Sequence, residues 1–358
     1  MIRVLVANTE LPSKKIGSWT NRITRLLEEY PAFFDYILSP TTNPSSSHIF
    51  CKKKKWIPFF PKKLRSWEVL NHQAGAFIKA FQKLSIQNKP VQVVVMDDML
   101  LLEAFALLKL KGYEFELIFS FHGHSFQFSG PWASQVNKVL FLTQKGYLET
   151  FSRHEEFTPL VSVIGNGVDS GLFFPLSKSE KAKRKQELGI DPNSPVLIWL
   201  SNNRPKKGLY IFQKLAQSLL AKYPDLEILI IGAIRESKSE NRRVHYLGKI
   251  PNHELPHYLQ SGDFYAFPSL WKEGFGLSLA EALKCGNQVL ASNTGGIPEV
   301  IEGVPGSFLI HQPNVVEAWE AGFEEAWKNK DEFIPNPDLL AQLHDLGEWK
   351  KKFLAALE

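Results

Sequence analysis

Short, nearly uninterrupted apolar runs recur along the chain and alternate with segments of helical character. Residues 93–95 (Val-Val-Val) and 228–231 (Ile-Leu-Ile-Ile) leave no polar side chain to face solvent. Strands of this kind are buried on both faces, as in a parallel sheet covered by helices. The alternation runs through both halves of the chain, which predicts an α/β fold with two Rossmann-like, doubly wound sheets. The expected strands are 3–7, 91–96, 116–121, 138–143, 160–164, 196–200, 227–231, 244–247, 264–267, 288–291 and 308–310.

The length of 358 residues favours two domains over one. Residues 169–194 hold a proline, a charged run and an Asp-Pro-Asn turn, which is typical of a linker with a short helix. We therefore predict a first domain over 1–170 and a second over 171–337, with a C-terminal helix within 338–358 that packs back on the first. The other expected helices are 18–29, 67–84, 100–110, 145–157, 209–222, 254–260 and 279–283.

Cysteine usage and hydropathy narrow the class of protein. Cys51 and Cys285 are the only cysteines, which disfavours a disulfide scaffold and fits a reducing compartment. Neither has a CxxC partner or a histidine cluster, so no structural zinc site is predicted. No apolar run reaches 18 residues, so no membrane-spanning helix is expected. The first residues resemble a strand and not a signal peptide, and we expect a cytoplasmic protein.

Residues 273–281, Glu-Gly-Phe-Gly-Leu-Ser-Leu-Ala-Glu, carry the most chemical information. A strand, a glycine-rich turn and a helix N-terminus form a phosphate site, because free backbone N–H groups and the helix dipole point at the anion. Glu273 and Glu281 flank this turn, and carboxylates suit hydroxyl donors better than phosphate. A phosphate flanked by hydroxyl-bearing groups describes a nucleotide sugar. The alternative is an ordinary surface turn with two solvated carboxylates.

Further polar residues follow other predicted strands. Arg204 and Lys207 come after strand 196–200, where Lys207 could neutralise a diphosphate, although a solvated basic turn would look the same. His122 ends strand 116–121 and is placed to meet a substrate, or is a structural imidazole. His122 and His124 could suggest a metal site, but no third metal-ligating residue lies near them in the sequence, so none is predicted there. After strand 91–96, Asp98 is expected to cap a helix.

Two glycine-containing turns complete this pattern. Residues 164–169 include Asn166 between glycines, which suits a chain reversal between the domains and a wall of the substrate cleft. Gly17 precedes the first helix and would let the backbone approach a ligand closely, a signal that is weak by itself.

Residues 52–65 combine seven basic residues with aromatic ones and contain no acidic residue. Lysine and arginine are attracted to anionic lipid, and Trp and Phe favour the membrane interface. Single-stranded nucleic acid is the competing partner, but no RNA-binding signature accompanies the segment. We expect an anionic membrane surface as the partner and no nucleic acid; the remaining alternative is a solvated insertion.

Together these pieces resemble the retaining glycosyltransferases of family 4, also called group 1 glycosyltransferases, which have the GT-B fold. The resemblance is dense over about 160–310. There the block 273–281 is followed by Gly-Gly-Ile-Pro-Glu at 295–299 and preceded by Asn-Gly-Val-Asp at 166–169. From 1 to 160 it rests on Gly17, on His122-Gly123 and on the strand–helix alternation. Arg204 lies only three residues before Lys207, closer than is usual in the family.

The resemblance implies a first domain that binds the acceptor, a second that binds the donor, and a role for each site residue. Glu281 would hold the ribose of the donor and Glu273 its sugar, and Lys207 with Arg204 would bind the diphosphate. His122 would sit at the sugar. The remaining donor-binding residues would be Gly274, Phe275, Gly276, Leu277, Ser278, Lys249, Ile250, Asn166 and Gly17.

The implied activity is transfer of a hexose-type sugar from a nucleoside-diphosphate sugar, UDP- or GDP-linked, with retention of configuration and without a metal or other cofactor. The expected acceptor is a hydroxyl of a glycan or lipid-linked glycan of bacterial cell-surface polysaccharide or lipopolysaccharide synthesis. The alternatives are a nucleotide-sugar epimerase of the same fold and a non-catalytic nucleotide-sugar binding protein. Peripheral association with the inner face of the cell membrane would follow from residues 52–65.

Overall fold

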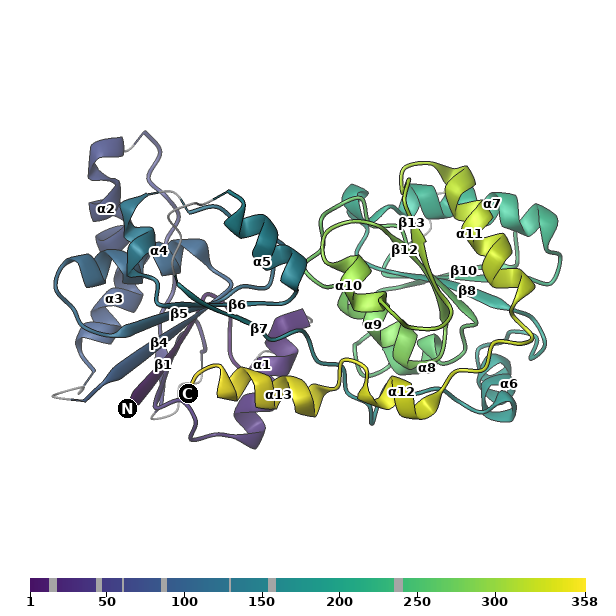
Figure 1. The fold of residues 1–358 in the computed structure, drawn as a ribbon, viewed down its shortest axis with the longest axis horizontal. Coiled ribbons are helices and arrows are strands. Elements are labelled where there is room, and N and C mark those ends of the chain that lie inside the picture. Colours follow the sequence, from purple (N-terminus) through teal and green to yellow (C-terminus); the bar gives the residue numbers. More distant parts are fainter. Residues whose placement is uncertain are drawn as a thin grey trace. The chain divides into compact units, whose positions relative to one another are not determined.

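A computed structural model describes residues 1–12, 18–42, 47–59, 61–84, 89–128, 130–153, 159–234 and 241–358. The chain divides into two compact units. The first comprises 1–164 together with 352–358, and the second comprises 165–351. Each unit is a parallel sheet with its own helices (Figure 1). The last seven residues of the chain thus belong to the first unit, where Gln92 Nε2 donates to the carbonyl of Leu357 at 2.9 Å.

The first unit is built on a seven-stranded sheet of order β3-β2-β1-β4-β5-β6-β7. Strand β4 (Val91–Met96) is wholly buried between β1 and β5, as its unbroken apolar run predicts. The other strands are β1 (Ile2–Ala7), β2 (Tyr36–Ser39), β3 (His48–Phe50), β5 (Glu116–Ser120), β6 (Lys138–Phe141) and β7 (Leu160–Val163). The helices are α1 (Ser18–Glu29), α2 (Arg65–Trp67), α3 (Gly75–Gln82), α4 (Met99–Leu110) and α5 (Gln144–Phe151), with 3-10 turns η1 (Lys62–Leu64) and η3 (Pro131–Gln135) and the π-helical η2 (Glu68–Gln73).

The second unit is built on a six-stranded parallel sheet of order β10-β9-β8-β11-β12-β13. Its core lies between the central strands and helices α7 and α11, around Trp199, Phe212, Trp319 and Phe323. The strands are β8 (Val196–Leu200), β9 (Glu227–Ile231), β10 (Val244–Gly248), β11 (Phe264–Phe267), β12 (Gln288–Ser292) and β13 (Ser307–Ile310). The helices are α6 (Lys178–Glu187), α7 (Leu209–Lys222), α8 (Leu255–Leu259), α9 (Leu277–Lys284), α10 (Ile297–Ile301), α11 (Val316–Lys328) and α12 (Pro337–Gln342), with the 3-10 turn η4 (Pro205–Lys207). Helix α13 (Leu346–Ala355) begins in this unit and ends in the first.

The prediction of two doubly wound α/β sheets is confirmed, with several differences in detail. Strands β2 and β3 were missed, because their four and three residues are too short for a pattern. The single helix expected over 67–84 is broken, since η2 widens into a π-helix before α3. The helices α10, α11 and α12 were also missed. No helix in the described part of the chain is both long and apolar enough to cross a membrane.

Candidate functional site

In the second unit, the loops after β8, β11 and β12 meet at one edge of the sheet. Glu273 lies in the loop after β11, and its Oε1 is 2.5 Å from Lys207 Nζ, which comes from the loop after β8. Ser269 Oγ donates to the same oxygen at 2.6 Å. The carboxylate is thus held by an ammonium and a hydroxyl at the carboxyl ends of parallel strands, where α/β folds bind ligands.

Backbone contacts fix these loops to one another. The Leu270 N–H donates to the carbonyl of Lys206 at 2.8 Å, and a Cβ at Gly208 would lie 1.9 Å from the carbonyl oxygen of Pro268. From the loop after β12, the Gly296 N–H donates to the Glu273 carbonyl at 2.8 Å. Gly295 has a φ of +56°, and a Cβ there would lie 2.5 Å from the same carbonyl oxygen. A glycine at 295 is therefore needed for the close approach to Glu273.

Helix α9 begins directly after the glycine turn, with Gly276 at its N-cap in the left-handed region. The N–H groups of Leu277 and Ser278 lie in the first turn of the helix, where backbone donors have no partner within the helix. Ser278 Oγ is 3.0 Å from the hydroxyl of Tyr265, whose burial raises the pKa of that phenol. The structure therefore contains the strand, turn and helix N-terminus that the sequence predicted as a phosphate site.

The other predicted donor-binding residues take different positions in this unit. Glu281 is half-buried on α9, and Lys249 and Ile250 directly follow edge strand β10. Phe275 is buried, with its ring edge-on to His344 at 4.9 Å. Gly274 lies in the turn. Arg204 is exposed, and its side chain makes no hydrogen bond or ion pair with the described residues, whereas Lys207 contacts Glu273.

Asn166 has a structural environment within the second unit. It is 5% exposed, and its Oδ1 accepts from the N–H of Gly167 at 3.2 Å. A Cβ on Gly167 would lie 2.9 Å from Leu346 Cα, so this glycine lets the segment pack against α13. These contacts explain why the turn is glycine-rich, and a role of Asn166 toward a donor stays a prediction. Gly17 lies outside the described residues.

His122 belongs to the first unit, at the carboxyl end of β5. Its Nε2 is 3.2 Å from Ser120 Oγ, and its ring stacks on Trp19 with centroids 5.5 Å apart. Its N–H donates to Asp97 Oδ1 at 2.9 Å. Burial, with Arg22 nearby, lowers the pKa of His122 well below its usual value, so the imidazole is neutral at pH 7. A neutral imidazole can orient a hydroxyl but is a poor source of positive charge.

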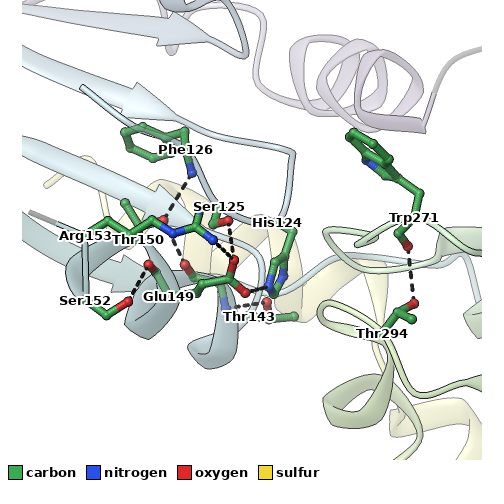
Figure 2. Close-up of polar contacts among 11 residues, drawn as sticks. His124, Ser125, Phe126, Thr143, Glu149, Thr150, Ser152, Arg153, Trp271 and Thr294 are labelled. Carbon is green, nitrogen blue, oxygen red and sulfur yellow. Dashed lines mark hydrogen bonds and ion pairs between the residues drawn. The ribbon is translucent and has the colours of Figure 1, made fainter. Parts of the chain in front are cut away.

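The loop after His122 is clamped by a second polar network (Figure 2). His124 is buried, and its Nε2 is 2.9 Å from Glu149 Oε2 on α5. Ser125 and Arg153 donate to the other oxygen of Glu149 at 3.1 and 2.7 Å. His124 is thus a structural residue that holds the loop on α5. No cluster of three or more potential metal ligands occurs among the residues whose placement is described.

Asp98 caps a helix, as the sequence predicted. Its Oδ1 accepts from the N–H groups of Leu100 and Leu101 at the start of α4, at 3.1 and 3.0 Å. Asp97, which precedes it, instead accepts the hydrogen bond from the N–H of His122. This second role was missed, because nothing in the sequence relates Asp97 to a backbone amide 25 residues further along.

Sequence reasoning also missed three residues of the second unit. Ser269 shares Glu273 with Lys207, and its position directly after β11 is the signal that could have found it. Trp271 is 55% exposed beside Glu273, with Lys206 Nζ 4.0 Å from its ring centroid. Thr294 Oγ1 donates to the carbonyl of Trp271 at 3.2 Å (Figure 2).

Comparison with solved structures defines the class of fold. Sucrose-phosphate synthase from Thermosynechococcus elongatus superposes with a TM-score of 0.74 at 15% identity, over 99% of this chain and 97% of that one. Anabaena HepE, solved in complex with UDP, gives 0.71 at 17% identity, over 100% and 99%. The chain has the GT-B fold of glycosyltransferases, as the sequence predicted.

Comparison of sequences gives the family. Residues 180–338 match the family model "Glycosyl transferases group 1". A GDP-mannose-dependent monoacylated alpha-(1-6)-phosphatidylinositol monomannoside mannosyltransferase of Corynebacterium glutamicum is 27% identical over 48% of this chain and 49% of its own length. An alpha-maltose-1-phosphate synthase of Mycolicibacterium smegmatis is 27% identical over 50% and 48%. The chain thus spans about half the length of these curated relatives.

Proposed function

We propose that this protein is a retaining, metal-independent glycosyltransferase that moves a hexose-type sugar from a nucleoside-diphosphate sugar to a hydroxyl acceptor. The observation that carries the proposal is the Glu273 carboxylate, held by Lys207 and Ser269 beside the N-terminus of α9. This arrangement places a cation and helix N–H groups next to a hydrogen-bond acceptor. A diphosphate with an attached sugar needs both kinds of group.

The ion pair gives the Lys207 ammonium two alternative partners during the reaction, Glu273 before the donor binds and the diphosphate afterwards. Without donor, its charge is balanced by Glu273 at 2.5 Å. A bound diphosphate would take a share of the ammonium, and Glu273 would then accept hydrogen bonds from sugar hydroxyls. Ser269 would keep the carboxylate in place through this exchange, because its hydroxyl donates to Oε1 independently of Lys207.

Charge develops on the β-phosphate as the sugar becomes oxocarbenium-like. Lys207 and the N–H groups of Leu277 and Ser278 would stabilise this charge more in the transition state than in the ground state. Arg204 is exposed in the same loop as Lys207 and would add a second cation. Fixed cations and backbone donors would thus supply what a metal supplies in other sites.

Retention follows if the acceptor attacks on the face that the diphosphate leaves. The released phosphate oxygen would take the proton of the acceptor hydroxyl, so no enzymic base is needed. The neutral His122 would orient the sugar and would not act as the main base. Glu281, on α9, would hold the ribose hydroxyls through its carboxylate.

The proposed donor is a UDP- or GDP-sugar, and the proposed acceptor is a glycan or lipid-linked glycan of bacterial cell-surface polysaccharide or lipopolysaccharide synthesis. Two named similarities support this choice: one solved structure holds UDP, and one relative acts on a phosphatidylinositol mannoside. A cytoplasmic enzyme peripheral to the inner face of the membrane could reach such an acceptor.

The test begins with thermal shifts in UDP-, GDP-, ADP- and TDP-sugars, because a ligand that binds the folded state raises Tm by mass action. The stabilising donor is then incubated with and without lipid-linked glycan acceptors, and with EDTA. Product with retained anomeric configuration in EDTA is expected. An epimerised donor formed without acceptor would establish the epimerase, and binding with no reaction would establish a non-catalytic binding protein.

A further inference from the structure

Residues 52–59 and 61–67 of the first unit combine fastened residues with exposed basic and apolar ones. The segment is fastened to the protein through its main chain at two points. The Lys54 N–H donates to the carbonyl of Gln73 at 2.9 Å, and the Ile57 N–H donates to Oε1 of buried Glu68 at 2.8 Å. Gln73 Nε2 donates to the same Glu68 oxygen at 2.8 Å. The segment is therefore shaped by the fold and does not need a partner to order it.

Two of its seven basic residues belong to this fastening. Lys53 Nζ is 2.6 Å from Asp98 Oδ2, and Arg65 is 2.9 Å from Glu103 Oε2 on α4. Both carboxylates are largely buried. Lys53 and Arg65 therefore neutralise acidic groups of the first unit itself. The remaining basic residues are exposed and have no acidic residue beside them in sequence: Lys52, Lys54, Lys55, Lys62 and Lys63.

The segment also presents large apolar side chains to solvent. Trp56, Phe59, Leu64 and Trp67 are 65, 101, 45 and 54% exposed. Phe59 also has a φ of 59°, in the left-handed region that bulky residues rarely adopt. Figure 1 shows α2, which ends at Trp67, at the end of a column of helices that continues into α3. Exposed apolar side chains gathered in one short segment indicate an interaction surface.

We propose that residues 52–67 dock the protein on an anionic lipid bilayer, with Trp56, Phe59, Leu64 and Trp67 in the interface and the five exposed lysines on the headgroups. Indole and phenyl rings favour the headgroup level of a bilayer, and lysine stems can bury while their ammonium groups stay in water. Charge complementarity selects anionic lipid. This docking deepens the proposed function, because a lipid-linked acceptor would be met at the membrane surface. It rests on the proposed function in that respect only.

The structure favours a membrane over single-stranded nucleic acid as the partner. Base stacking needs ring faces arranged along a basic groove, and an aliphatic side chain offers no face for it. Here Leu64 lies among the exposed apolar residues, and the lysines flank them. A bilayer accepts aliphatic and aromatic side chains alike, because it requires only apolar surface beside positive charge.

The experiment is sedimentation of the full chain with vesicles of phosphatidylcholine, alone or with one third phosphatidylglycerol. The chain is expected to pellet with the anionic vesicles only, and less at high salt. Replacing Lys52, Lys54 and Lys55 by Gln should weaken binding roughly a hundredfold. The matched control replaces Lys79, Lys83 and Lys111, three exposed lysines of the same unit, by Gln and should change binding less than threefold.

A second variant tests insertion independently of charge. Trp56→Ala with Phe59→Ala should weaken binding at least tenfold at unchanged charge. Lys53→Gln should instead lower Tm and leave vesicle binding nearly unchanged. The proposal is overturned if the wild-type chain stays in the supernatant with anionic vesicles, or if replacing the control lysines weakens vesicle binding equally. A wild-type chain that binds a labelled oligonucleotide and no vesicles, with oligonucleotide binding lost in the two variants, would identify nucleic acid as the partner instead.

Nucleotide binding on the same preparations separates this proposal from the proposed function. Calorimetry with UDP and GDP should give the same affinity for the wild type and for the variants of 52–67. Vesicle binding without any nucleotide binding would refute the glycosyltransferase and leave the docking surface standing. Nucleotide binding without vesicle binding would refute the docking surface and leave the proposed function standing.

Discussion

Lys207 Nζ lies 2.5 Å from Glu273 Oε1, so the cation proposed for the diphosphate and the carboxylate proposed for the sugar form one ion pair. The two residues come from loops after different strands, β8 and β11, which are neighbours in the sheet. Their side chains are 19 and 14% exposed, so solvent screens the pair only in part. A ligand that engages one of them must therefore change the surroundings of the other.

Lys207→Ala should lower kcat about a hundredfold while the affinity for nucleoside diphosphate falls only a few-fold. The reason is that loss of one preorganised charge at a leaving group acts mainly on the transition state. Steady-state kinetics with the donor identified by thermal shift would measure both effects. Lys206→Ala is the matched control, because that ammonium lies over the Trp271 ring and not on Glu273. Equal losses in the two variants would contradict the role of Lys207.

Glu281→Ala should weaken binding of the nucleoside diphosphate roughly tenfold or more, since a hydrogen bond to a charged group contributes about 1.5–3 kcal/mol. Calorimetry with UDP or GDP measures the change, and Glu281→Gln should retain part of the affinity because its amide oxygen still accepts. The corresponding 2′,3′-dideoxy nucleotide should bind the wild type and Glu281→Ala alike. An unchanged affinity of Glu281→Ala for the normal nucleotide would argue against the ribose contact.

The second unit could be predicted closely because its signals are local. β8, β9 and β11 have the bounds that the sequence predicted, and the glycine turn before α9 is visible in residues 273–276. The ion pair of Lys207 with Glu273 could not be predicted, since it depends on which strands are neighbours in the sheet. Ser269 was missed for the same reason.

The first unit was predicted less completely, for a physical reason that also concerns its site. Its polar residues are fixed by contacts between residues distant in sequence, such as His122 with Trp19 and His124 with Glu149. Such contacts leave no periodic pattern. The basic aromatic segment was visible as composition, but its division into fastening and exposed residues depends on Asp98 and Glu103, which follow far along the chain.

Gly295→Ala should destabilise the protein by about 1–3 kcal/mol and misplace Glu273. A left-handed conformation disfavours any Cβ, and here the Cβ would also lie 2.5 Å from the Glu273 carbonyl oxygen. Gly303→Ala is the control, because Gly303 has a φ of +70° with no atom within 4 Å of its Cβ position. Chemical denaturation should show the larger loss for Gly295→Ala. Equal losses of unfolding free energy in the two variants would mean that the close contact with Glu273 adds nothing to the cost of a Cβ at positive φ.

Asp97 should make the stability of the protein depend on pH between about 4 and 6. Desolvation, opposed by the N–H of His122 and aided by the neighbouring Asp98, raises the pKa of Asp97 from 3.8 to about 6. Because the folded state holds this proton more tightly than the unfolded state, the resulting stability is present below pH 3.8 and is lost as pH rises through 6.

Asp97→Asn removes that titration and keeps an acceptor for the N–H of His122 at the same place. The Tm of the wild type relative to Asp97→Asn should therefore fall between pH 4 and 6.5 and stay level above it. Thermal unfolding of both proteins across this range measures the difference, and Asp35→Asn serves as a control carboxylate that also accepts a backbone N–H, from Arg3. A wild-type difference that is flat across the window, or one matched by Asp35→Asn, would show that Asp97 ionises normally in the folded protein.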